Sequence, residues 1–161
     1  MASPSIRGVL PDVGAQAPEL RYVKPDRSNA SLSELNGQVV VLLSMPSLDT
    51  KICAVETRVF NQRAAEIGAH VLALTMDLPM AMKRFCEVEG IANVHMGSDF
   101  RFRDLSEKWN AAIAEGPLEA TTCRAVWVID PNGVVRYHEW VVELGNEPDY
   151  EAALKAAKEL L

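Results

Sequence analysis

The most constraining feature of this sequence is an apolar, strand-like run that passes almost directly into a helical pattern carrying a cysteine. The run from Val39 to Leu43 is continuous in valine and leucine, as a central strand covered on both faces would be. The pattern that follows predicts a helix that opens just before Cys53 and ends at Gly68. Its apolar face is predicted from residues that recur at a 3.6-residue period: Ile52, Val55, Val59, Phe60, Ala64 and Ile67.

The rest of the chain alternates strand-like and helix-like segments. We expect strands at 19–23, 38–44, 69–75 and 95–97, and a hairpin formed by 125–129, the turn 130–133 and 134–138. Helical segments are expected at 31–35, 104–111 and 150–161, and at 77–90, where Asp77 would be the N-cap and Pro79 would lie in the first turn. This order predicts an α/β fold with a central mixed β-sheet flanked by α-helices. We expect one domain over residues 1–161, with an irregular N-terminal arm at 1–18.

Charge and hydropathy narrow the classes of partner. A net charge of −6 and a pI near 5.1, without any local basic run, argue against binding to nucleic acid or to an anionic membrane. The N-terminal residues lack the apolar core of a signal peptide, and no apolar stretch is long enough to span a bilayer. We therefore expect a cytoplasmic protein whose partners are small molecules or proteins.

Three cysteines, at positions 53, 86 and 123, are too few and too widely spaced for a secreted disulfide framework or a zinc site, and there is no CxxC motif. The three histidines also lack ligand spacing, so no metal is expected. No glycine-rich phosphate loop follows a strand, so no nucleotide cofactor is expected. In a reducing compartment, such cysteines are either inert core residues or catalytic ones.

Cys53 is the candidate nucleophile because of its predicted place in the first turn of a helix. The unpaired N–H groups and the positive dipole end of that turn favour a thiolate over a thiol. Thr50, one turn upstream, can cap the helix or bond the sulfur, and Pro46 can shape the loop and remove a competing donor. The alternative is a small apolar residue packed under the sheet, and position alone leaves both interpretations open.

The motif PxxxTxxC, here Pro46, Thr50 and Cys53, resembles the active-site signature of peroxiredoxins. The longer segment PSLDTKICAVETRVFNQ is similar to the thiol peroxidases, the atypical two-cysteine subfamily. Three further segments match the subfamily, so that the resemblance spans about residues 14–155: MDLPMAMKRFCEVEGIANV, GPLEATTCRAVWVID and NEPDYEAAL.

The resemblance implies the thioredoxin-like fold that the strand and helix order also indicates. It implies reduction of hydrogen peroxide and organic hydroperoxides by a homodimer that thioredoxin recycles. Cys53 would attack the peroxide, Cys86 would resolve the sulfenic acid as an intramolecular disulfide, and Arg124 would be the active-site arginine. Departures from the subfamily pattern are Cys123, which we interpret as a packed small residue, Lys51 in place of glycine, and a short N-terminal arm.

Thiol acidity alone does not make a fast peroxidase. Lowering the pKa of a free cysteine by roughly 3 units raises its thiolate fraction at neutral pH about 30-fold but lowers its nucleophilicity about 20-fold. Most of the acceleration must come from holding the peroxide and stabilising the departing oxygen, roles that we assign to Arg124 and Thr50.

Cys53 and Cys86 are predicted at opposite ends of neighbouring helices, beyond the reach of a disulfide. We therefore expect the turn after Thr50, or the segment around Cys86, to unwind during turnover. Two other functions remain open: a peroxide sensor that signals through Cys53 oxidation, and a thioredoxin-type disulfide reductase, which the missing CxxC disfavours.

Overall fold

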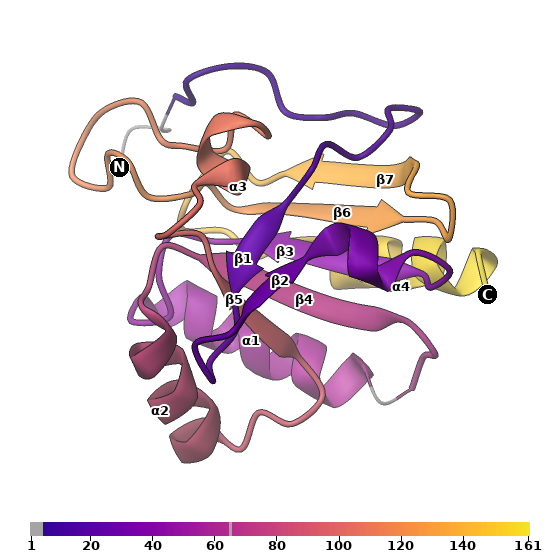
Figure 1. Ribbon diagram of the computed structural model, residues 1–161, viewed down its shortest axis with the longest axis horizontal. Helices are drawn as coiled ribbons and strands as arrows, with labels where there is room; N and C mark the ends of the chain where they lie inside the picture. Colours follow the sequence, from indigo (N-terminus) through magenta and orange to yellow (C-terminus); the bar gives the residue numbers. More distant parts are fainter. Residues whose placement is uncertain (1–4, 65) are drawn as a thin grey trace.

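The computed structural model describes residues 5–64 and 66–161 (Figure 1). Seven strands alternate with α-helices and one short 3-10 helix, η1. In chain order the elements are β1 (Arg21–Val23), β2 (Asn29–Ser31), η1 (Leu32–Leu35), β3 (Val40–Ser44), α1 (Lys51–Ala64), β4 (His70–Thr75), α2 (Pro79–Glu89), β5 (His95–Ser98), α3 (Asp104–Glu107), β6 (Ala125–Ile129), β7 (Val135–Trp140) and α4 (Tyr150–Glu159).

The strands form one mixed sheet in the order β2-β1-β5-β4-β3-β6-β7. Strands β3, β4 and β5 run parallel, and β6 pairs antiparallel with β3 and with β7. The register places Leu42 of β3 opposite Leu72 of β4 and Trp127 of β6. The α/β fold with a mixed sheet is therefore confirmed, and the continuous apolar run of β3 is explained by its central position.

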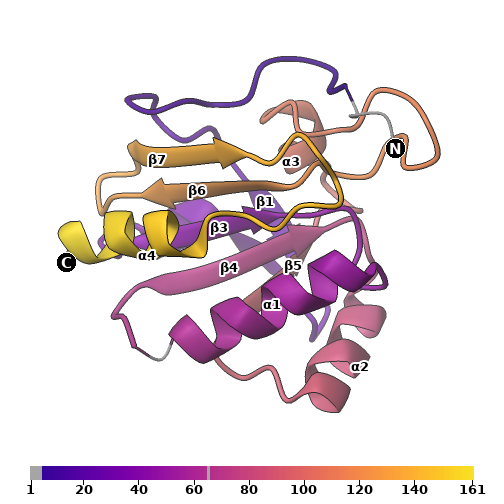
Figure 2. The same ribbon diagram turned by 180° about the vertical axis from the view of Figure 1, so that it is seen from behind.

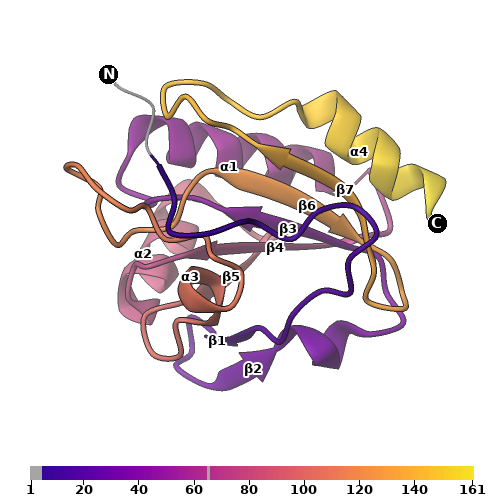
Figure 3. The ribbon, with the colours of Figure 1, turned by 90° about the horizontal axis from the view of Figure 1, so that it is seen from above.

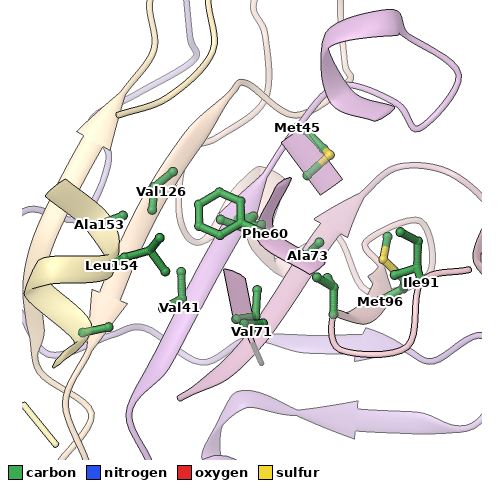
Figure 4. Packing of buried hydrophobic residues seen from close by; sticks show 14 of the residues in the cluster. Val41, Met45, Phe60, Val71, Ala73, Ile91, Met96, Val126, Ala153 and Leu154 are labelled. Carbon is green, nitrogen blue, oxygen red and sulfur yellow. The ribbon is translucent and has the colours of Figure 1, made fainter. Parts of the chain in front are cut away.

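Helices cover the two faces of the sheet unequally. Figures 2 and 3 show α1 and α4 on one face, with α3 and the N-terminal segment on the other. Successive side chains of β3 enter different cores, with Val41 and Leu43 on the α1 side and Val40 and Leu42 on the α3 side. In Figure 4 the Phe60 ring of α1 lies between β3 and β6, with α4 residues beside it. This core fixes α1, the helix that carries Cys53, against the sheet.

The inward face of α1 differs from the predicted one. Of the six residues predicted to form it, only Phe60 and Ala64 are buried, and the others are half-buried. The remaining buried positions of α1 are Cys53, Glu56 and Thr57. The 3.6-residue apolar pattern did not identify this face because it includes two polar residues, Glu56 and Thr57, which form hydrogen bonds inside the protein.

Three predicted helices end at least two residues earlier than expected. Helix α1 ends at Ala64, before Gly68, and tight turns follow, in which Glu66 N donates to Arg63 O and Ile67 N to Ala64 O. Helix α3 spans only Asp104–Glu107, and the left-handed conformation of Asn110, with φ of 59°, excludes a helix that continues to the predicted end at 111. Helix α4 ends at Glu159, two residues before the predicted end.

The predicted cap of α2 is also wrong. The N-cap is Leu78, which has no capping side chain, while Pro79 and the left-handed Gly90 occupy the expected positions at the two ends. The Asp77 carboxylate instead accepts hydrogen bonds from a different loop. Those donors come from the segment before α1, so tertiary contacts outcompete the local capping rule here.

Residues 5–18 cross the α3 face of the sheet with little regular structure, and residues 1–4 of the predicted arm lie outside the described part. The segment is attached by isolated bridges from Ile6 to Ile113 and from Gln16 to Val134. Strand β2 was not predicted, because its three residues, Asn29–Ser31, carry no extended alternating pattern.

Gly97 in β5 leaves room for the side chains of Tyr22 and Leu74. A Cβ at this position would lie 2.6 Å from the Tyr22 ring and closer still to the Leu74 side chain. Gly97→Ala is expected to lower the free energy of unfolding by about 1–3 kcal/mol through this overpacking. Urea unfolding measures the change. In the control, Gly68→Ala, the nearest atom lies 3.9 Å away, and the stability should stay within about 0.5 kcal/mol of wild type. Equal effects of the two substitutions would contradict the prediction.

Candidate active site

Cys53 lies in the first turn of α1, where the chain leaves β3 through the loop 45–50. Its side chain is fully buried. The Cys53 N–H donates to Thr50 Oγ1 at 3.4 Å, which is the hydrogen bond that an N-cap hydroxyl accepts. The Thr50 hydroxyl in turn donates to Ser47 O at 3.0 Å. Thr50 therefore caps the helix, which was one of the two roles that the sequence left open for it.

Arg124 reaches the Cys53 sulfur from the other side. It immediately precedes β6, and its Nη1 lies 3.3 Å from Cys53 Sγ, to which it donates a hydrogen bond. The guanidinium is almost completely buried, and its Nη2 donates to Leu144 O at 3.1 Å. A buried, permanently charged donor next to the sulfur also remains available to an oxygen atom bound there.

Glu56 is the site residue that the sequence analysis missed. It lies one turn beyond Cys53, is fully buried, and accepts a hydrogen bond from Arg124 Nη1 at 2.8 Å. The same guanidinium nitrogen thus contacts both the sulfur and the carboxylate. An acidic residue three positions from a helical cysteine is the signal that would have placed it on the cysteine's face.

Burial raises the pKa of Glu56 to about 7, although the Arg124 guanidinium opposes this rise. The other oxygen of the carboxyl, Oε1, has no hydrogen-bond partner among the described residues. The Arg124 guanidinium therefore contacts two ionisable groups, the Glu56 carboxyl and the Cys53 thiol, in the protein interior. When Glu56 is protonated, the Arg124 guanidinium no longer faces a charged carboxylate.

Pro46 is buried at the end of β3, inside the loop that leads to Cys53. The carbonyl of the preceding Met45 accepts a hydrogen bond from Thr122 Oγ1 at 2.8 Å, which fixes the loop to the segment before β6. Because proline has no N–H, it adds no backbone donor at this point. The structure thus links three of the five predicted residues, Thr50, Cys53 and Arg124, by hydrogen bonds, and Pro46 lies in the loop that leads to them.

Cys86, the fifth predicted residue, is separate from this group. It lies on α2, is half-buried, and has a pKa raised by burial and by the neighbouring Glu87. Both Cys53 and Cys86 are free thiols in this structure. Cys53 lies in the first turn of α1 and Cys86 near the C-terminal end of α2, so we still expect a disulfide between them to require movement of at least one of the two segments.

Cys123 is fully buried on the other face of the sheet from Cys53, where it packs as the predicted small residue. Burial raises its thiol pKa to about 12, which suppresses the reactive thiolate.

Across residues 5–64 and 66–161, no group of three or more potential ligands among His, Cys, Asp and Glu is placed to hold a metal ion. In the same part of the chain, no helix has both the length and the apolar character needed to cross a bilayer.

With this geometry defined, known proteins were compared with the chain. The profile of the Redoxin family matches residues 12–154. The chain belongs to the Redoxin family. A thiol peroxidase from Leptospira interrogans is 43% identical over 159 residues, which cover 97% of this chain and 93% of the relative. Thiol peroxidases from Mycobacterium bovis (44% identical; 92% of this chain, 90% of the relative) and Aquifex aeolicus (42%; 92% and 88%) are similar.

A solved structure is similar over the whole fold. The crystal structure of a peroxiredoxin-like protein from Aquifex aeolicus superposes with a TM-score of 0.93 at 38% identity, covering 98% of this chain and 92% of that one. Together with the thiol peroxidase relatives, this similarity shows a thioredoxin-like peroxiredoxin. The activity of this Redoxin family member is the reduction of peroxides, which makes it a peroxidase of the oxidoreductase class.

The raised pKa of Glu56 predicts a pH-dependent contribution to stability. Because its folded pKa of about 7 lies above the ordinary value of 4.5, its contribution to the free energy of unfolding is fully present below pH 4.5 and is lost as pH rises through 7. Between about pH 5 and about pH 8, wild type should therefore lose on the order of 1–3 kcal/mol more than Glu56→Gln. Urea unfolding of both proteins at the two pH values measures this difference. If the difference in the free energy of unfolding between the two proteins is the same at both pH values, Glu56 does not titrate in this range.

Proposed function

We propose that Cys53 is the peroxide-attacking nucleophile and that Cys86 resolves its oxidised form in a thioredoxin-dependent cycle. The substrates would be hydrogen peroxide and organic hydroperoxides. The observation that carries this proposal is the hydrogen bond from the buried Arg124 guanidinium to the Cys53 sulfur, at 3.3 Å. A cation aimed at a thiol in the first turn of a helix is the arrangement that attack on an O–O bond requires.

The first step forms one bond and breaks another. The Cys53 thiolate attacks one peroxide oxygen, an S–O bond forms, and the O–O bond breaks. The departing oxygen leaves with the electron pair of that bond and takes up a proton as water or an alcohol. Arg124 holds the thiolate and would stabilise negative charge on the oxygens, while Thr50 keeps the first turn in place and Pro46 shapes the loop.

The second step restores a reducible form of the enzyme. The Cys86 sulfur attacks the sulfur of the Cys53 sulfenic acid, the S–O bond breaks, and water leaves with the thiol proton. A dithiol reductant then returns two electrons and two protons to the disulfide. We propose thioredoxin for this reaction, which the resemblance of the active-site segments supports.

We further propose a cytoplasmic homodimer built from a single domain per chain over residues 1–161. The free thiols suit a reducing compartment. An exposed apolar surface formed by Leu78, Met80 and Phe100 at the start of α2 and after β5 supports association with a second copy.

Substitution of each cysteine separates the roles. Cys53→Ser is expected to abolish peroxide consumption coupled to thioredoxin and its reductase. Cys86→Ser should keep one stoichiometric oxidation per chain and lose sustained turnover, because no disulfide forms for thioredoxin to reduce. Cys123→Ala is the matched control and should retain wild-type turnover per folded enzyme. Mass spectrometry of the peroxide-treated wild type should show a disulfide between residues 53 and 86. A single stoichiometric event in wild type would instead favour the peroxide sensor.

Replacement of Arg124 measures its share of the chemistry. Arg124→Lys keeps a positive charge but removes the planar set of donors, so the second-order rate constant for Cys53 oxidation should fall by about 100-fold. Stopped-flow tryptophan fluorescence provides that constant. Arg136→Lys is the control, because its side chain pairs with Asp130 at the distant hairpin, at 2.7 Å. A loss below about threefold for Arg124→Lys would remove the arginine from the mechanism.

A further inference from the structure

Asp77 lies in the turn between β4 and α2, and its carboxylate is the acceptor for a different loop. Oδ1 accepts a hydrogen bond from Ser47 Oγ at 2.8 Å, and Oδ2 accepts one from Leu48 N at 2.7 Å. Oδ2 also accepts from Thr75 Oγ1 at 2.8 Å. Two of these three donors belong to the segment that leads to Cys53, so the carboxylate joins that segment to the turn before α2.

The backbone of Asp77 is itself fixed to the sheet. Its N–H donates to Thr75 Oγ1 at 2.9 Å, and its carbonyl accepts from Ser98 Oγ at 2.5 Å. Thr75 and Ser98 are the last residues of β4 and β5. The carboxylate is therefore presented to the loop from two neighbouring strands and not from a mobile turn.

The contacts continue from Asp77 to Cys53. The carbonyl of Ser47 accepts hydrogen bonds from Thr50 N at 3.1 Å and from Thr50 Oγ1 at 3.0 Å. Thr50 Oγ1 then accepts the hydrogen bond of the Cys53 N–H. A series of three hydrogen bonds thus runs from the Asp77 carboxylate through Ser47 and Thr50 to the first turn of α1.

A cavity lies between this loop and α2. It has a volume of about 130 Å³ and is lined by Leu48 and Asp49 on one side and by Arg84 and Phe85 of α2 on the other, with Asp77 also in its wall. Figure 2 shows α2 beginning beside the N-terminal end of α1 and running away from it. Because the loop and the helix are incompletely packed, the hydrogen bonds to Asp77 carry much of the attachment between them, and space is present for the loop to move.

We propose that Asp77 is a positioning residue that keeps the loop 47–50 closed, and that release of its hydrogen bonds is the step that lets Cys53 approach Cys86. The inference rests on the proposed roles of these two cysteines. The closed loop places Cys53 against Arg124 for attack. Because Cys86 lies near the far end of α2, we expect disulfide formation to need the open loop. Weakening the hydrogen bonds between Asp77 and the loop therefore raises the small fraction of molecules with the loop open. The fraction with the loop closed stays nearly unchanged because it is much larger.

This mechanism predicts unequal effects on two rate constants. Asp77→Asn replaces a carboxylate oxygen by a donor, and it should accelerate disulfide formation after a single oxidation by about tenfold. The rate constant for oxidation of Cys53 should change by less than about twofold, because the closed form still predominates. Overoxidation of Cys53 at high peroxide should fall by about tenfold, since the disulfide forms sooner. Ser47→Ala removes only one of the two loop donors, and an acceleration of about threefold is expected.

Stopped-flow tryptophan fluorescence of the reduced protein mixed with peroxide measures both rate constants. Asp130→Asn is the matched control, because Asp130 also accepts three hydrogen bonds, from Asn132 N, Val134 N and Arg136 Nε, at the distant hairpin. It should lower stability without accelerating disulfide formation. Equal acceleration in Asp130→Asn, or parallel changes in both rate constants of Asp77→Asn, would overturn the proposal.

Amide hydrogen exchange of the reduced protein tests the attachment of the loop 47–50 to Asp77 without a reaction with peroxide. The Ala54 N–H donates to Thr50 O at 3.1 Å and, like the Cys53 N–H, makes no contact with Asp77 itself. Both amides should exchange about tenfold faster in Asp77→Asn if the attachment holds the first turn. Unchanged exchange rates of these two amides would exclude the attachment by Asp77, whatever the peroxide kinetics show. Failure of wild type to form the 53–86 disulfide, together with faster exchange in the variant, would count against the proposed resolving role and leave the attachment intact.

Discussion

The Arg124 guanidinium donates from a single nitrogen to the Cys53 sulfur and to the Glu56 carboxylate, inside the protein core. Burying an isolated cation is strongly unfavourable, so this arrangement persists only because its partners are held in place. Those partners come from α1 and from the carbonyl of Leu144 in the segment after β7. The residue after Arg124, Ala125, pairs with Ser44 at the end of β3, the strand that leads into the Cys53 loop. The sheet register therefore aligns the Arg124 guanidinium with the Cys53 sulfur.

Prediction from the sequence succeeded where local pattern and tertiary environment agree. The runs that became β3, β4 and β6 are mostly apolar, and they lie at the centre of the sheet, covered on both faces. The glycine at position 90 ends α2 in the left-handed conformation expected of a C-cap. A short motif was enough to place Pro46 and Thr50 in the loop and Cys53 in the first helical turn, because their spacing in sequence lies entirely within that motif.

Prediction failed where a distant partner decides the environment of a residue. Glu56 sits within an otherwise apolar helical pattern, and a charged side chain there indicates a solvent-facing position. Its burial depends on Arg124, 68 residues away in sequence. Asp77 satisfies every local criterion for an N-cap, yet the donors of the Ser47–Leu48 segment, about 30 positions upstream, bind its carboxylate instead. Neither partner is visible in a window of sequence as short as one helix.

The two faces of the sheet also keep the thiols of this protein apart. Cys123 and Arg124 are neighbours in sequence, but the alternation of an extended chain sends the cysteine into the opposite core from Cys53. Thiol–disulfide exchange requires direct approach of one sulfur to another, and a layer of paired strands stands between these two. The sheet thus separates the Cys123 sulfur from the Cys53 sulfur, although Cys123 directly precedes Arg124 in the sequence.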